Sequence, residues 1–263
     1  MLLNVITSLI YLYVASVYLI NLWTNRRVMF KSVNYIIITG AAFHLISVLL
    51  IIKSGYRDVF QLDNLLYVFS LLIILVFIVY QFKVKSHVLG ALLFPFVFLL
   101  TLPSVVLPPD LATSLKTPNN YLILIHVLVT FLGQAVFTIA FLAGLLYLFE
   151  ENRIKNKKVN NLLKKFPSLT SLDNINFYSL IIGFPILTIG LALGIVISKH
   201  MWGVLLRWHQ KEIWAVVTWI LYALLIYSRI GLGFKGKKSA IGAILGFAVI
   251  IITFIALGYL PEW

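Results

Sequence analysis

Eight long apolar runs dominate this sequence, and they constrain its fold more than any other feature. A helix that rises about 1.5 Å per residue needs roughly 20 apolar residues to cross a bilayer core about 30 Å thick. With 62% hydrophobic and only 11% charged residues, the chain has more apolar surface than a soluble core can bury. We therefore predict an all-α integral membrane protein with a bundle of about eight transmembrane helices. The runs lie at about 2–23, 34–53, 62–82, 87–103, 119–149, 177–198, 213–231 and 239–260.

Two of these runs differ from the others in length. The fourth is short and contains Pro95, so we expect a kink or a partly interfacial segment there. The fifth is long enough to tilt or to protrude from the bilayer.

Lys and Arg predict the orientation of the helices, because short cytoplasmic loops collect these residues. If both termini are outside, fifteen of the 21 basic residues are on the inner side, which favours this orientation. We attribute the net charge of +13 to this asymmetry and to attraction for anionic membrane lipid. No soluble basic domain is present to bind nucleic acid. The inner residues are Arg26, Arg27, Lys31, Lys83, Lys85, Arg153, Lys155, Lys157, Lys158, Lys164, Lys165, Arg229, Lys235, Lys237 and Lys238, and the outer ones are Lys53, Arg57, Lys116, Lys199, Arg207 and Lys211.

No soluble domain and no internal repeat interrupts the apolar runs, so we predict a single transmembrane domain over 1–263. The absence of cysteine excludes disulfides, thiol relays, Cys–zinc sites and covalent haem attachment to this chain. Small residues recur on one side of two runs, where they allow close helix packing. These residues are Gly183, Gly190, Gly194 and Ser198 in the sixth run, and Gly242 and Gly246 in the eighth.

Two histidines lie within predicted spans. His44 is near the centre of the second run, and His126 is near the outer end of the fifth, on one helix face with Thr130, Gly133 and Gln134. An ionisable group in the membrane needs a partner within the bundle. Each histidine therefore either hydrogen-bonds a neighbouring helix or ligates a metal or haem iron.

Four of the six tryptophans lie in the segment Trp202–Trp219, at the outer end of the seventh run. We predict a short amphipathic helix over 199–212 that lies in the membrane interface. Any one of these tryptophans is explained as a membrane-interface residue. Four together indicate a surface on which a porphyrin stacks, with Arg207 or Lys211 pairing with its propionates.

This tryptophan-rich segment resembles the signature of the cytochrome c assembly family, which includes CcsA, CcmC, CcmF, HemX and YpjD-like proteins. The family pattern is roughly W-G-x-x-W-x-W-D-P-K-E-x-W, followed by T-W, Y-A and L-H-x-R. The family's H-V-x(6)-G-Y-A-x-F element appears as His126-Val127, then Gly133-Gln134-Ala135 and Phe137, with five intervening residues instead of six and Gln134 in place of Tyr, and its early histidine appears as His44. The eight-helix size is most similar to the HemX and YpjD-like branch. The chain keeps Trp202, Gly203, Trp208, Lys211, Glu212, Trp214, Thr218, Trp219, Tyr222, Ala223 and Arg229 of the pattern.

The departures from the pattern affect the expected ligands. The resemblance to CcsA implies two histidine pairs, one within the membrane and one at an external haem, and each pair lacks a member here. Tyr227 stands at the position of one missing histidine, and the other has no counterpart near 257–263. Tyr227 is then a possible oxygen ligand, and His200 or His209 a possible partner of His126. Leu206, His209 and Gln210 replace Trp, Asp and Pro of the pattern.

The resemblance implies a b-type haem, bound without a covalent bond, and a prokaryotic cytoplasmic membrane with the tryptophan-rich loop outside. We expect a protein that holds, transports or delivers haem rather than an enzyme, and we assign no catalytic residue. Glu212 beside Lys211 is expected to form a structural ion pair. Two alternatives remain: a HemX-type regulatory partner of glutamyl-tRNA reductase, docking at 153–165, and a haem-ligating component of a cytochrome c synthase with an assembly partner.

Overall fold

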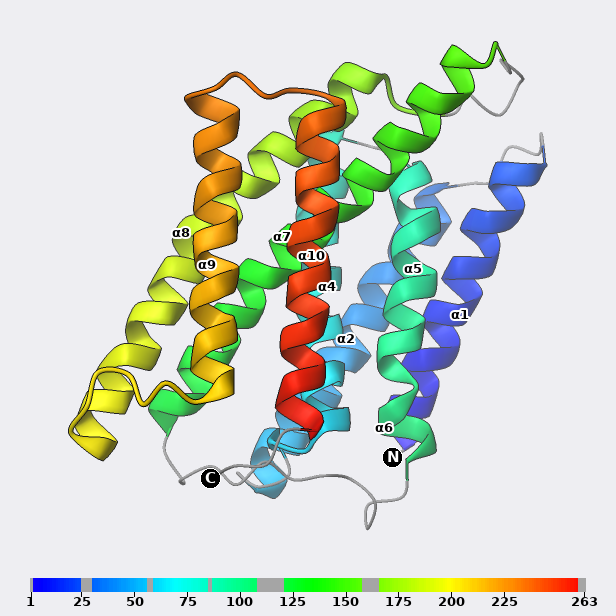
Figure 1. Cartoon of the computed structure of the whole chain (residues 1–263). Coiled ribbons are helices and arrows are strands. Elements are labelled where there is room, and N and C mark those ends of the chain that lie inside the picture. The colour runs from blue at the N-terminus through cyan, green and yellow to red at the C-terminus, as the bar shows by residue number, and fades with distance from the viewer. Residues whose placement is uncertain are drawn as a thin grey trace. The chain divides into compact units, whose positions relative to one another are not determined.

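A computed structural model describes residues 2–24, 30–55, 59–84, 87–107, 121–157 and 166–259. Eight segments within these ranges are long and apolar enough to cross a membrane, which confirms the predicted all-α fold with eight spans. The long helices agree with the apolar runs to within a few residues at most ends. The described helices are α1 (Leu2–Trp23), α2 (Phe30–Ser54), α4 (Leu62–Val84), α5 (His87–Thr101), the short α6 (Pro103–Val106), α7 (Tyr121–Lys155), α8 (Leu169–Trp202), α9 (Gln210–Ile230) and α10 (Lys237–Tyr259) (Figure 1).

The helices form two compact units. The first unit comprises Met1–Thr117 and Arg153–Pro167 and contains α1, α2, α4, α5 and α6. The second unit comprises Pro118–Asn152 and Ser168–Trp263 and contains most of α7 with α8, α9 and α10. The single domain over 1–263 stays a prediction.

In the first unit, α1 packs against α2 and α5, and α4 packs against α2 and α5. Its core contains aromatic rings, among them Tyr18 and Phe94, which stack with centroids 5.5 Å apart. The helix α5 continues through Pro95. Its 15 residues give only about 22 Å of length. One residue, Leu102, separates α5 from the short helix α6, which has Pro103 in its first turn, and together the two helices make the span Val88–Val106.

In the second unit, α7 and α8 pack with their backbones in close contact. A Cβ atom added at Gly133 would lie 2.9 Å from the backbone nitrogen of Leu187, and one at Gly183 would lie 2.6 Å from the Phe137 ring. The same test at Gly190 gives 2.5 Å to the Thr130 hydroxyl. These distances are too short for any side chain larger than hydrogen, and they confirm the predicted packing role of small residues on the sixth span.

The helix α8 begins eight residues before the predicted start of the sixth run. The prediction missed these first two turns because polar contacts, and not an apolar run, hold them in place. Ser168 caps the helix by accepting a hydrogen bond from the Ser171 backbone N–H at 3.2 Å. Asn176 then donates to the backbone carbonyl of Ala140 on α7 at 3.0 Å. Apolar periodicity alone therefore underestimated the length of this helix.

The predicted short helix over 199–212 is wrong. Residues 199–202 belong to the end of α8, and residues 203–209 connect α8 to α9 without helical structure. The physical reason is Gly203, whose φ of +76° ends α8 in the left-handed conformation that glycine adopts without strain. Its N–H donates to the Lys199 carbonyl at 3.0 Å.

Part of the charge argument falls outside the described residues. The orientation with both termini outside stays a prediction. The basic residues that lie outside the described ranges are Arg26, Arg27, Arg57, Lys85, Lys116, Lys158, Lys164 and Lys165, and the terminal residues 260–263 lie outside them as well.

Candidate functional site

His44 lies on α2 and is fully buried in the first unit. Its Nε2 atom is 3.1 Å from the backbone oxygen of Tyr67 on α4, and its Nδ1 atom is 3.0 Å from the Tyr11 hydroxyl on α1. A carbonyl oxygen only accepts, so Nε2 carries the proton and Nδ1 accepts from Tyr11. His44 thus joins three helices, which is one of the two roles that the sequence left open. In this arrangement neither ring nitrogen has a free lone pair for a metal.

A cluster of small polar side chains surrounds this histidine. The Ser47 hydroxyl donates to the Asn4 side-chain oxygen at 2.5 Å, and the Ser70 hydroxyl donates to the Tyr67 carbonyl at 2.7 Å. The Tyr67 hydroxyl lies beside the hydroxyls of Thr7 and Ser47, without a hydrogen bond of standard geometry. The first unit therefore contains a polar centre built from α1, α2 and α4.

His126 is placed differently, on α7 in the second unit. Its Nδ1 atom donates to the backbone carbonyl of Gly190 on α8 at 2.7 Å, so Nε2 carries the lone pair. Among the described residues, Nε2 has no hydrogen-bond partner. The ring lies against Gly194, where an added Cβ would be 2.8 Å from its Cε1 atom. A histidine whose Nδ1–H is held by a carbonyl is oriented as metal-ligating histidines commonly are, so His126 fits an iron ligand.

The loop 203–209 is held by the carboxylate of Glu212. Its Oε2 atom accepts hydrogen bonds from the backbone N–H groups of Arg207 at 2.6 Å and Trp208 at 3.0 Å. Its Oε1 atom pairs with the Arg207 Nε atom at 3.3 Å. Glu212 does form a structural ion pair, and Arg207 is its partner in the described part of the chain.

Two tryptophans beside these Glu212 contacts are exposed at the surface. Trp208 is 66% exposed and has a φ of +59°, a conformation that costs a non-glycine residue about 1–2 kcal/mol. The Arg207 guanidinium lies 3.6 Å from the centroid of the Trp202 ring, and Trp202 is 41% exposed. A strained backbone that keeps an indole exposed is typical of a binding surface.

The other predicted binding residues lie along α9 or at its start. Trp219 donates from its indole nitrogen to the Thr188 hydroxyl on α8 at 2.9 Å. Trp214 and Lys211 are half-buried, and His209 is the residue before the first turn of α9. Tyr227 is 62% exposed, near the opposite end of α9.

His126 and Trp219 contact the same level of α8 from different sides. His126 binds the Gly190 carbonyl and Trp219 binds the Thr188 side chain, two residues away. Positions two apart point about 200° apart around a helix. The described contacts therefore bring Trp202, at the end of α8, together with the loop residues Arg207 and Trp208, and they separate the Trp219 side chain from His126 by the thickness of α8.

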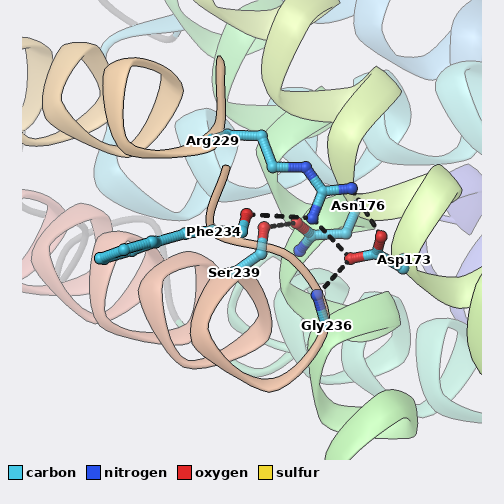
Figure 2. Close-up of polar contacts among 6 residues, drawn as sticks. All are labelled: Asp173, Asn176, Arg229, Phe234, Gly236 and Ser239. Carbon is cyan, nitrogen blue, oxygen red and sulfur yellow. Dashed lines mark hydrogen bonds and ion pairs between the residues drawn. The ribbon is translucent and has the colours of Figure 1, made fainter. Parts of the chain in front are cut away.

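A polar network at the opposite end of the second unit was not predicted. Arg229 on α9 makes two hydrogen bonds to Asp173 on α8, at 2.7 and 2.6 Å, and Asp173 also accepts from the Gly236 backbone N–H at 2.8 Å (Figure 2). Beside them, Ser239 on α10 donates to Asn176 at 2.8 Å (Figure 2). The sequence did contain a signal for the Arg229–Asp173 pair. Arg229 lies in a membrane span, where a charge needs a partner of opposite sign, and the chain offers only eight acidic residues as candidates.

The described helices define a multi-pass membrane protein. Residues 60–262 match the family model described as "Cytochrome C assembly protein", so the chain belongs to the cytochrome c assembly protein family. This confirms the family that the tryptophan-rich segment indicated.

Three relatives share the name "Cytochrome c biogenesis protein CcsA". The protein of Guillardia theta is 29% identical over 233 residues, which are 80% of this chain and 76% of the relative. That of Trieres chinensis is 27% identical over 289 residues, 96% of this chain and 92% of the relative. That of one strain of Prochlorococcus marinus is 33% identical over 184 residues, 60% of this chain and 58% of the relative.

Proposed function

We propose that this protein binds a b-type haem without a covalent bond, at the end of the second unit that carries the loop 203–209. The observation that carries the proposal is the orientation of His126, whose Nδ1–H is held by a backbone carbonyl while Nε2 keeps its lone pair. Membership of the cytochrome c assembly family supports a role in holding, transporting or delivering haem, in cytochrome c biogenesis or haem metabolism. When bound, haem supplies a redox-active iron and two propionate carboxylates.

Different residues would bind the iron, the porphyrin face and the propionates of the haem. His126 would ligate the iron. His44, in the first unit, is also proposed as an iron ligand of the chain, but it would first have to give up one of its two hydrogen bonds. The indoles of Trp202, Trp208 and Trp214 offer stacking surfaces, and Arg207 with Lys211 offers cations to the propionates. Trp219 lies on the other side of α8 from His126 and is not part of this surface. Gly203 and His209 complete the proposed binding set at this end, whereas Tyr227 lies near the opposite end of α9 and does not reach it. By the charge asymmetry, this end of the unit faces the extracytoplasmic side of the cytoplasmic membrane.

A haem titration of the purified, detergent-solubilised protein tests this. We expect a Soret band that saturates with added haemin and an affinity at least tenfold lower in His126→Ala. Added imidazole should restore the band, because it fills the space of the missing ring. The matched control is Thr130→Val, one turn along the same face of α7, which keeps the shape of the side chain. Unchanged haem affinity and spectrum in His126→Ala would remove the ligand assignment.

A second candidate function is a haem-ligating component of a cytochrome c synthase. The name of the relatives favours it, since the chain spans 92% of the Trieres chinensis protein. The discriminating experiment is production of holocytochrome c when the chain is expressed with an assembly partner and an apocytochrome. A carrier alone gives haem binding without holocytochrome.

Within the family we place the chain in the HemX and YpjD-like branch. Tyr227, at the position of a missing histidine, is largely exposed on α9, which favours loss of that ligand.

The HemX-type regulatory role, with glutamyl-tRNA reductase as partner, is favoured by the basic end of α7, where Lys155 and Lys157 are exposed. A change in reductase level that persists in a double His44 and His126 variant would identify this role.

A further inference from the structure

We propose that the turn between α9 and α10 binds an anionic phospholipid. Residues 231–238, here called the lysine turn, connect the span Gln210–Ile230 directly to the span Lys237–Phe254, so the turn lies at a membrane surface. By the charge asymmetry this is the cytoplasmic surface, whose lipids are partly anionic. The turn carries three exposed lysines, which are Lys235, Lys237 and Lys238.

The part of the chain that the structure describes does not neutralise this positive charge. Within it, none of the three lysines forms an ion pair with a carboxylate. Asp173 is close enough to Lys235 to interact electrostatically, but its oxygens already accept two hydrogen bonds from Arg229 and one from Gly236 (Figure 2). The other two lysines begin α10, whose first turn has no acidic residue. An anion bound at this surface therefore lowers the electrostatic energy of all three lysines.

The backbone of the lysine turn is held by several contacts. The Phe234 N–H donates to the Ser228 carbonyl at 3.0 Å, and the Phe234 carbonyl accepts from Arg229 at 3.3 Å. Two residues further on, the Gly236 N–H donates to Asp173 at 2.8 Å, with a φ of +61° that glycine adopts without strain. A backbone that is already ordered loses little conformational entropy when a ligand binds. The lysines are thus positioned before the lipid arrives.

Apolar side chains beside the lysines favour a lipid over a soluble phosphate. Leu232 is 55% exposed and Phe234 is 37% exposed. The Phe234 ring points away from the Asp173–Arg229 pair (Figure 2), and the Lys238 Nζ atom lies 4.4 Å from the centroid of this ring. An ammonium group over an exposed ring at a membrane surface can contact a phosphate while the ring contacts acyl chains. The occupant is therefore a phospholipid, with its phosphate at the lysines and its chains at Leu232 and Phe234.

The test is a lipid titration of the purified full chain in a neutral detergent, with bound lipid counted by native mass spectrometry. Phosphatidylglycerol is the anionic probe, and phosphatidylcholine is the neutral one. The double variant Lys235→Gln with Lys237→Gln removes two charges from the turn. Each lysine near an anionic surface contributes about fivefold to binding, so we expect the affinity for phosphatidylglycerol to fall roughly 25-fold. Binding of phosphatidylcholine should not change.

The matched control is Lys155→Gln with Lys157→Gln, which removes the same charge from exposed lysines at the C-terminal end of α7. We expect this variant to bind phosphatidylglycerol as the parent does. Equal losses in the two double variants would overturn the site, because binding would then follow net charge alone. So would equal affinity of the parent for the two lipids.

Glycerol 1-phosphate separates a lipid from a soluble phosphate, because it has the phosphate and no acyl chain. We expect it to displace phosphatidylglycerol only at concentrations at least about a hundredfold higher, since it buries no apolar surface. Displacement at equal concentration would overturn the assignment to lipid. No haem is present in these titrations, so their result does not depend on the proposed haem function.

Discussion

The pair formed by Asp173 and Arg229 allows a prediction whose size follows from its burial. The Arg229 side chain is 6% exposed and that of Asp173 is 15% exposed. Asp173→Asn keeps the shape of the side chain, but it removes the negative charge and can point an NH₂ group at the guanidinium. Breaking a buried pair on one side costs about 3–5 kcal/mol, because the remaining charge is left uncompensated.

The double variant Asp173→Leu with Arg229→Met separates charge from packing. It removes both charges and leaves apolar side chains of similar volume, a change that is often neutral or stabilising. The Gly236 N–H loses its acceptor as well, which costs about 1–3 kcal/mol if it stays buried. We therefore expect the double variant to lose at most about 3 kcal/mol, less than the single variant.

The assay is unfolding by SDS titration in mixed detergent micelles, followed by circular dichroism, with the free energy of unfolding compared among parent, single and double variants. A loss below about 1 kcal/mol in Asp173→Asn would refute the reasoning. It would mean that Arg229, one residue from the end of α9, reaches water or lipid phosphate with its long side chain.

Three further changes test other contacts. Gly194→Ala places a methyl group 2.8 Å from the His126 ring, so we expect the free energy of unfolding to fall by about 1–3 kcal/mol and the Soret band to weaken; an unchanged band would contradict the placement of that ring. Glu212→Ala removes the acceptor of two backbone N–H groups, so hydrogen exchange at the Trp208 amide should become about tenfold faster, and equal protection would show that the loop holds itself. Tyr222→Phe removes a buried hydroxyl that has no partner among the described residues, so stability should stay equal or rise by about 1 kcal/mol, and a drop of that size in thermal unfolding would reveal a missed partner.

The long apolar runs were sufficient to predict the helices, because the bilayer sets their length and composition. The predicted first span, 2–23, coincides with α1. The glycine positions Gly183, Gly190 and Gly194 also predicted a packing face, since only a small residue permits such contact in lipid. At the start of α8, where polar contacts such as that of Asn176 hold the helix, hydropathy did not predict the helical residues.

The tryptophan-rich segment 202–219 was recognised from its composition, but the conformation predicted for 199–212 was wrong. Its apolar residues have helical spacing, which indicated a short interfacial helix. Spacing cannot report that Glu212 binds the backbone N–H groups of Arg207 and Trp208, because that contact spans a turn whose shape depends on Gly203. The sequence does contain Gly203, a residue type that often ends helices, and a carboxylate nine residues later at Glu212. These two residues together could have indicated a helix end followed by a loop.

The two histidines show most clearly what a sequence leaves out. Both were predicted to be inward-facing imidazoles in spans, and the same two roles were open to each. The contacts differ in one respect: Nδ1 accepts from Tyr11 in His44 and donates to Gly190 in His126. That difference depends on the residue that the fold brings opposite, 33 positions away for one and 64 for the other, which no local pattern contains. Because His44 accepts from a side-chain hydroxyl and His126 donates to a backbone carbonyl, a single substitution can remove the partner of His44 but not that of His126.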